Sequence, residues 1–134
     1  MGNRHKDNVI RRLGDLLHQE SGVVCAYLFG STARGEDTAG SDIDLALLTR
    51  APCPTTLLNP LSRLQMRLED ALRGPVDLVD LRTAPPDLVH RILRDGILVV
   101  DRAPNERIAF EVQARNDYFD LLPHLHEYRR TGSG

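Results

Sequence analysis

The chain has 134 residues, of which 41% are hydrophobic and 27% charged, so it suits one globular domain and is too short for two of ordinary size. This apolar content excludes a disordered chain, and no uncharged apolar run reaches the roughly 18 residues of a membrane-spanning helix. A formal net charge of −2 argues against a small domain whose main role is to coat nucleic acid. Because the first residues lack the apolar stretch of a signal peptide, we expect a cytoplasmic protein in which Cys25 and Cys53 are free thiols.

Hydrophobic spacing, together with glycine and proline breaks, predicts the elements of the first half of the chain. In chain order they are an amphipathic helix carrying Val9 to Leu17, a buried strand Val23–Phe29, a polar stretch Gly30–Ser41, a strand Asp42–Leu48, and a helix on the stripe Leu57, Leu61, Leu64, Leu68 and Leu72.

The second half continues the alternation of strands and helices. It predicts a strand Val76–Leu81, a short helix opened by Pro85 and Pro86 and ended by Gly96, a strand Ile97–Val100, and a long helix from Pro104 that Pro123 should bend or end. The order predicts an α/β or α+β domain with about four strands and with helices packed on the sheet. We expect a single domain over residues 1–130 and a flexible tail over 131–134.

The polar stretch after the first strand has the features of an anion site. The strand ends at Gly30, and Ser31 is placed to cap a short helix whose free N–H groups point outward. A glycine has no Cβ and lets a phosphate approach the backbone closely, and the serine hydroxyl adds a donor. This pattern favours a phosphate-binding turn.

Two carboxylates follow directly on the next strand. Asp42 and Asp44 are two residues apart, so both should project from one face, ~6–7 Å apart along the chain, while Ile43, Leu45 and Leu47 face the core. Paired carboxylates repel each other unless a cation lies between them, and Mg²⁺ favours such oxygen ligands while keeping positions open for phosphates. The turn and the pair together predict a site for a Mg²⁺–nucleotide.

A third carboxylate is offered by the strand Val76–Leu81. Asp77 and Asp80 are three apart and face opposite ways on a strand, so only one can join the pair. Asp77 is flanked by apolar residues, and a carboxylate inside an apolar strand is costly without a partner. We therefore expect Asp77 to be the third ligand, although the residues alone do not decide firmly between the two.

Gly30-Ser31, ten residues, then Asp42-Ile43-Asp44 resembles the GSx(10)DxD signature of the DNA polymerase beta-type nucleotidyltransferase superfamily. The fuller motif, Gly-Ser-x-Ala-Arg-Gly followed by Ser-Asp-Ile-Asp-Leu, is similar to the minimal nucleotidyltransferases, or MNT antitoxins, which are paired with HEPN-domain ribonuclease toxins. The likeness extends to Val76-Asp77-Leu78-Val79 and loosely to the last helix. It implies a polymerase-beta-like core with a four-stranded mixed sheet.

The resemblance also implies roles for individual residues. Gly30 and Ser31 would hold the β- and γ-phosphates of ATP, with Arg34 and Ser41 also among the nucleotide-binding residues. Asp42, Asp44 and Asp77 would be the catalytic metal ligands for two Mg²⁺ ions in an in-line displacement at the α-phosphorus. Arg34 has an equal alternative, which is to brace the loop by pairing with Asp37 or Asp42.

The leading hypothesis from this resemblance is an antitoxin that transfers AMP from ATP to a hydroxyl, most simply that of a tyrosine, on its cognate HEPN toxin. A second hypothesis is an antitoxin that occludes the toxin by docking without catalysis, and a third is a nucleotidyltransferase for a small antibiotic. A template polymerase is disfavoured because no basic domain is present to hold a duplex, and we expect neither a membrane nor a nucleic-acid partner.

The last helix carries more apolar surface than a small sheet needs. Its large side chains are Tyr118, Phe119, Leu121, Leu122, Leu125 and Tyr128. Core packing and a partner-binding face both remain open for this segment.

Overall fold

The structure, a computed structural model, describes residues 4–35, 42–50 and 60–132, with the backbone alone at residues 4, 60 and 124–132. Its elements are α1 (Arg4–His18), β1 (Val23–Phe29), α2 (Gly30–Arg34), β2 (Ile43–Thr49), α3 (Pro60–Leu72), β3 (Val76–Asp80), α4 (Pro86–Asp95), β4 (Ile97–Asp101) and α5 (Pro104–Gly132). Each of these four strands begins within one residue of the start predicted from the sequence.

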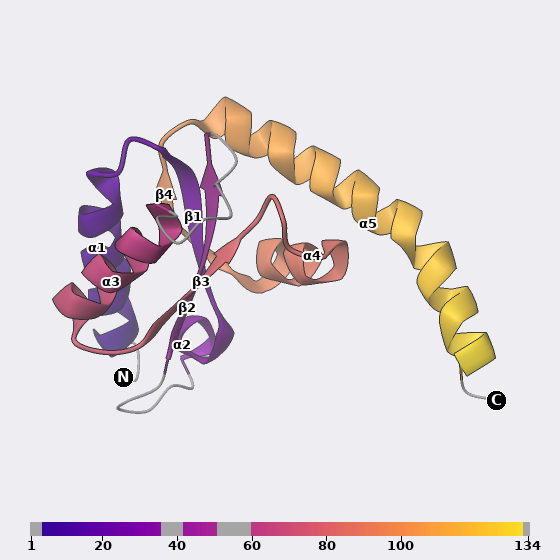
Figure 1. The fold of residues 1–134 in the computed structure, drawn as a ribbon, viewed down its shortest axis with the longest axis horizontal. Coiled ribbons are helices and arrows are strands. Elements are labelled where there is room, and N and C mark those ends of the chain that lie inside the picture. Colours follow the sequence, from indigo (N-terminus) through magenta and orange to yellow (C-terminus); the bar gives the residue numbers. More distant parts are fainter. Residues whose placement is uncertain (1–3, 36–41, 51–59, 133–134) are drawn as a thin grey trace.

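The strands form one mixed sheet in the order β3-β2-β1-β4 (Figure 1). β1 runs antiparallel to both β2 and β4, whereas β2 and β3 are parallel, with α3 between them in the chain. A parallel pair needs such a crossover, and α3 is the helix that supplies it. The predicted α/β fold with a four-stranded mixed sheet is confirmed.

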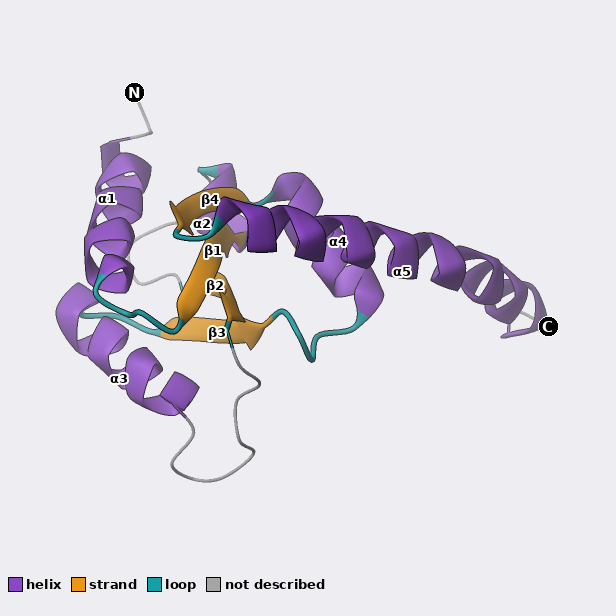
Figure 2. Ribbon diagram, turned by 90° about the horizontal axis from the view of Figure 1, so that it is seen from above, coloured by secondary structure: helices purple, strands orange, loops and turns teal. Residues whose placement is uncertain are grey.

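Helices cover both faces of the sheet (Figure 2). On one face α1 and α3 pack through Leu13, Leu17, Leu64 and Leu68 against inward residues of the strands, so the predicted leucine stripe is core, although Leu57 lies outside the described residues. On the other face α4 and α5 pack through Val89, Ile92 and Ala114 against Val24, Tyr27, Ala46 and Leu48. Cys25 belongs to this second layer as a free thiol, and burial raises its pKa to about 12, while Cys53 is outside the described residues.

Helix α5 is longer than the sheet it covers. It does not end at Pro123, which lies inside it, and it runs on to Gly132, taking in the first two residues of the expected tail. Figures 1 and 2 show that its C-terminal half extends away from the rest of the domain and curves along its length. None of the helices in the described ranges combines the length and the apolar character needed to cross a bilayer.

Candidate active site

The site begins where β1 turns into α2. Gly30 has φ +78°, and a Cβ on it would lie 2.2 Å from Oδ2 of Asp44. Both the left-handed backbone and the close approach of a carboxylate therefore require glycine here. Because Gly30 itself enters the helix, the N-cap position falls on Phe29, and no side chain caps it. The prediction that Ser31 caps this helix is wrong, and Ser31 instead lies half-buried in its first turn.

Helix α2 is a single closed turn. Gly35, with φ 73°, ends it, and its backbone N–H donates to the carbonyls of Ser31 and Thr32. The side chain of Thr32 is only 1% exposed, and its hydroxyl finds no hydrogen-bond partner within the described ranges. Thr32 was not singled out from the sequence, since a threonine between a serine and an alanine gives no signal of burial.

The acidic residues meet beside this turn. Asp44 lies in β2 opposite Phe29 of β1 and level with Asp77 of the parallel neighbour β3. Side chains at paired positions of adjacent strands point to the same face, with backbones about 4.8 Å apart. Asp42 precedes β2 by one residue and is exposed. The structure thus brings Gly30, Asp44 and Asp77 together, with Asp42 two residues away along the chain.

Asp77, and not Asp80, lies level with Asp44, but for another reason than the one argued from the sequence. Asp77 is exposed rather than enclosed by apolar neighbours, so the argument from an unpaired buried carboxylate was wrong. Asp80 is half-buried, stands level with Leu47 at the far end of β3, and accepts a 3.0 Å hydrogen bond from the backbone N–H of Arg82. The register of β3 against β2 places Asp77, and not Asp80, next to Asp44, and this register cannot be read from the sequence.

The three carboxylates influence one another electrostatically. The pKa of Asp44 is raised above its ordinary value, first by burial and then by the negative charges of Asp77 and Asp42, while Arg34 lowers it. The same guanidinium contributes to the lowered pKa of Asp95, after the hydrogen bond and charge of Arg94. The charge of Arg34 therefore reaches both the acidic cluster and Asp95 at the end of α4.

The donor set fits hard divalent cations. Carboxylate oxygens whose mutual repulsion raises a pKa gain from a cation placed between them, and Mg²⁺ prefers such ligands. Among the described residues, however, no three His, Cys, Asp or Glu side chains already converge into a closed metal-ligand set. Asp42, Asp44 and Asp77 are thus neighbours rather than a preformed cage. Ser41 and Asp37, which the sequence also brought into consideration, lie outside the described residues.

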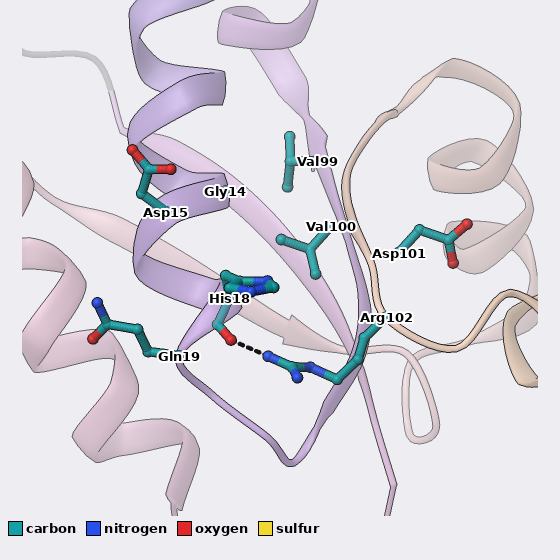
Figure 3. A pocket seen from close by; sticks show the side chains of 8 residues that line it. All are labelled: Gly14, Asp15, His18, Gln19, Val99, Val100, Asp101 and Arg102. Atoms are coloured by element: carbon teal, nitrogen blue, oxygen red, sulfur yellow. Dashed lines mark hydrogen bonds between the residues drawn. The ribbon is translucent and has the colours of Figure 1, made fainter.

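A separate hollow of about 870 Å³ lies between α1 and β4 (Figure 3). Its lining contains no residue of the predicted site. Two of its charged groups are already engaged, because Arg102 donates to the carbonyl of His18 at the end of α1, and Asp101 turns away toward Arg107, with which it pairs at 3.0 Å. We interpret this hollow as a gap in the packing of α1 against the edge strand β4.

Comparison with known proteins identifies the class to which this fold and this turn belong. Residues 11–105 match the family model described as polymerase beta, nucleotidyltransferase, and the chain belongs to this family. The expected superfamily is therefore confirmed over most of the chain, including every described residue of the candidate site.

Among curated proteins, the chain is 39% identical over 72 residues to the protein adenylyltransferase MntA of Shewanella oneidensis; the match covers 52% of this chain and 48% of that protein, so it spans about half of the relative. Among solved structures, a chain in the toxin–antitoxin crystal structure with AMP-PNP is 26% identical, with a TM-score of 0.78 over 93% of this chain and 98% of that one. A chain from the complex of the tri-AMPylated Shewanella oneidensis HEPN toxin with its MNT antitoxin shares the fold, with 24% identity and a TM-score of 0.74 over 96% and 99% of the two chains.

Proposed function

We propose that this protein is an antitoxin that acts as a protein adenylyltransferase, moving AMP from ATP to a hydroxyl of a cognate HEPN-domain ribonuclease toxin in the cytoplasm. The observation that carries this proposal is the contact of Gly30 with Asp44, in register with Asp77, within a nucleotidyltransferase fold. The relatives named as an adenylyltransferase and as a partner of an AMPylated toxin support the acceptor class.

The reaction is a displacement at the α-phosphorus of ATP. The acceptor oxygen, most simply the phenol oxygen of a tyrosine, forms a new P–O bond, and the bond to the oxygen bridging the α- and β-phosphates breaks. The electron pair leaves with pyrophosphate, and the proton of the acceptor passes to water. Gly30 leaves room for the Asp44 carboxylate beside the turn, and the half-buried hydroxyl of Ser31 would donate to the triphosphate.

Asp42, Asp44 and Asp77 would hold two Mg²⁺ ions, and these ions, when bound, would activate the acceptor hydroxyl and neutralise the departing pyrophosphate. The protein's own part is to hold the three carboxylates beside the turn between β1 and α2. Arg34 would contact the phosphates, because its positive charge already acts on Asp44 from the side of α2. Ser41, next to Asp42 in the chain, would complete the nucleotide-binding set.

The proposal is tested with the purified chain, its cognate HEPN toxin, Mg²⁺ and ATP labelled at the α-phosphate. We expect label on the toxin and release of pyrophosphate, and we expect neither from the Asp42→Asn, Asp44→Asn double variant. The Asp15→Asn variant, changed at an exposed acid of α1, is the matched control and should label the toxin normally. An unlabelled toxin with the wild-type chain, or full labelling by the double variant, would contradict the proposal.

The alternative of a docking antitoxin has one observation in its favour, which is the exposed apolar surface on α5. The Asp42→Asn, Asp44→Asn double variant distinguishes neutralisation by docking from neutralisation by AMP transfer. If that variant protects cells from the toxin as well as the wild type does at equal abundance, occlusion and not transfer neutralises the toxin. An antibiotic-modifying enzyme is less suited, because the described fold adds only α5 to the matched core.

A further inference from the structure

An apolar stripe runs along the outside of α5. Ile108, Val112, Phe119 and Leu122 have exposed fractions of 50%, 49%, 54% and 38%. Their spacings of four, seven and three residues place them on one side of a helix. A surface row of large apolar side chains on a single helix is typical of a protein interaction site rather than of scattered surface residues.

The stripe is distinct from the side of α5 that packs on the domain. Phe110 and Ala114 pack into the core layer, and Tyr118 stacks on His90 of α4 with ring centroids 3.7 Å apart. At about 100° of rotation per residue, these inward residues lie roughly a third of a turn from the stripe. The domain itself therefore cannot cover the stripe without unpacking α5. Leu125 and Tyr128, for which the sequence left core packing and a partner face open, have side chains outside the described part.

A basic hollow adjoins the stripe. Arg115 lies midway along it, between Val112 and Phe119, and also lines a pocket of about 240 Å³ between α4 and α5. The other lining residues are His90, Leu93, Arg94 and Glu111. Arg94 is engaged by Asp95 at 2.9 and 2.8 Å, and Glu111 pairs with Arg107. Arg115 has no ion-pair partner among the described residues, so it is placed to meet a carboxylate from outside.

We propose that this stripe and its basic pocket form the docking surface for the HEPN toxin, which binds through an apolar helical face carrying an acidic side chain opposite Arg115. The inference rests on the proposed function and adds to it the surface that recognises the acceptor protein. Apolar anchors around a central arginine have the composition of an energetically dominant interface centre.

A second copy of the chain is the less favourable occupant. A two-fold axis through the middle of the stripe would place Arg115 of one chain against Arg115 of the other. Like charges brought together in a desolvated interface are unfavourable and oppose the gain from the flanking apolar groups. A partner with a carboxylate at this position has no such conflict.

The surface also leads toward the candidate active site. Arg94 and Asp95 close the last turn of α4 at the pocket, and the charge of Arg34 in α2 acts on Asp95. A toxin seated on α5 and over this pocket therefore borders the turn that holds the nucleotide. Docking here would deliver an acceptor hydroxyl to ATP without any further domain.

The test uses the full chain and the cognate HEPN toxin, without ATP, in titration calorimetry. We expect the Val112→Glu, Phe119→Glu double variant to bind the toxin about 100-fold more weakly, and Arg115→Glu at least about 10-fold more weakly. Gln113→Glu, at an exposed site about a quarter of a turn or more from every residue of the stripe, is the matched control and should bind as the wild type does. Circular dichroism and binding of Mg²⁺–ATP should be unchanged in all three.

Unchanged toxin binding in both stripe variants overturns the docking surface. A second outcome also overturns it. In that outcome, light scattering shows that the wild-type chain is a dimer, and the double variant is a monomer that still binds the toxin with wild-type affinity. A wild-type chain that binds the toxin through the stripe but transfers no AMP supports the docking surface and contradicts the proposed function. The two proposals can therefore fail separately.

Discussion

At the scale of single residues, the junction of Gly30 with Asp44 is the most constrained point of the site. Two features require glycine at this position. Its φ of +78° is unfavourable for other residues, and a Cβ would lie only 2.2 Å from Oδ2 of Asp44. Any side chain here must either move the carboxylate or reshape the turn. The same contact explains why the residue before Ser31 must be a glycine in this chain.

We therefore expect Gly30→Ala to lower the free energy of unfolding by about 1–2 kcal/mol from the left-handed backbone alone. Displacement of Asp44 should also reduce AMP transfer on the order of 100-fold. Denaturant unfolding and the labelling assay measure the two effects. Gly22→Ala is the matched control, because nothing lies within 4 Å of a Cβ there. Equal activity of the two variants would show that the contact does not matter to the site.

The raised pKa of Asp44 has a consequence for stability. Protonation of this carboxyl stabilises the fold, fully below its ordinary value of 3.8, and that contribution is lost as the pH rises through the raised folded value. At neutral pH Asp44 is charged, so its burial and its repulsion by Asp77 and Asp42 lower the stability of the fold. Asp44→Asn should therefore raise Tm by about 1–3 °C at pH 7 while abolishing transfer, and the gain should vanish near pH 3. A variant less stable than the wild type at pH 7 would refute this reading, and Asp15→Asn serves as the control in the same melting curves.

At the scale of elements, the start of β3 is held from two sides. The backbone N–H of Val76 donates to Oε2 of Glu69 in α3 at 3.1 Å, and the N–H of Ile43 donates to the carbonyl of Pro75 at 3.1 Å. These bonds fix the residue before Asp77 against the strand that carries Asp44. The crossover helix thus sets the register on which the acidic cluster depends.

Glu69→Ala removes one of these anchors. We expect it to lower the free energy of unfolding by about 1 kcal/mol. It should also raise the Mg²⁺ concentration needed for half-maximal transfer, because Asp77 loses its fixed position. Glu69→Gln keeps an acceptor oxygen and should recover most of both losses. Asp70→Ala, at the exposed neighbouring position, controls for the loss of an acidic residue on α3. If Gln behaves like Ala, the hydrogen bond is not what positions β3.

The elements themselves follow from local physics that the sequence displays directly. The run Val23–Phe29 is apolar and bounded by glycines, and the structure gives the same bounds for β1. Helix ends and caps are harder, since they depend on backbone angles that neighbouring contacts decide. The helix after β1 begins at Gly30, which puts the N-cap at Phe29, and α5 continues through Pro123 in the part that extends away from the sheet.

At the scale of the whole molecule, the candidate site is assembled from segments 33 residues apart in the chain. The sequence predicted Gly30, Asp42 and Asp44 because they are close together and share a motif. It could not state the parallel register of β2 and β3, and so could not decide between Asp77 and Asp80 by distance. The docking stripe was left open for the same reason, because only the packing of α5 shows which apolar residues the domain leaves uncovered.

The acidic cluster makes a prediction about the stability of the entire domain. Without a cation, Asp42 and Asp77 act against the charged form of Asp44, and a triphosphate alone would add further negative charge beside them. Mg²⁺ and ATP together relieve that repulsion, so they should bind the folded chain cooperatively and raise Tm, whereas ATP with EDTA should not.

Ligand present at about 100 times its dissociation constant stabilises a protein by about 2.7 kcal/mol, which for a domain of this size corresponds to a rise in Tm of about 10 °C. Differential scanning fluorimetry with ATP at fixed concentration and increasing Mg²⁺ measures it directly. The Asp42→Asn, Asp44→Asn double variant should begin with a higher Tm and show almost no Mg²⁺-dependent increase, while Asp15→Asn should respond as the wild type does. A double variant that still gains the full increase would place the nucleotide and its metal elsewhere on the domain, because the carboxylates that a cation must bridge would then be dispensable.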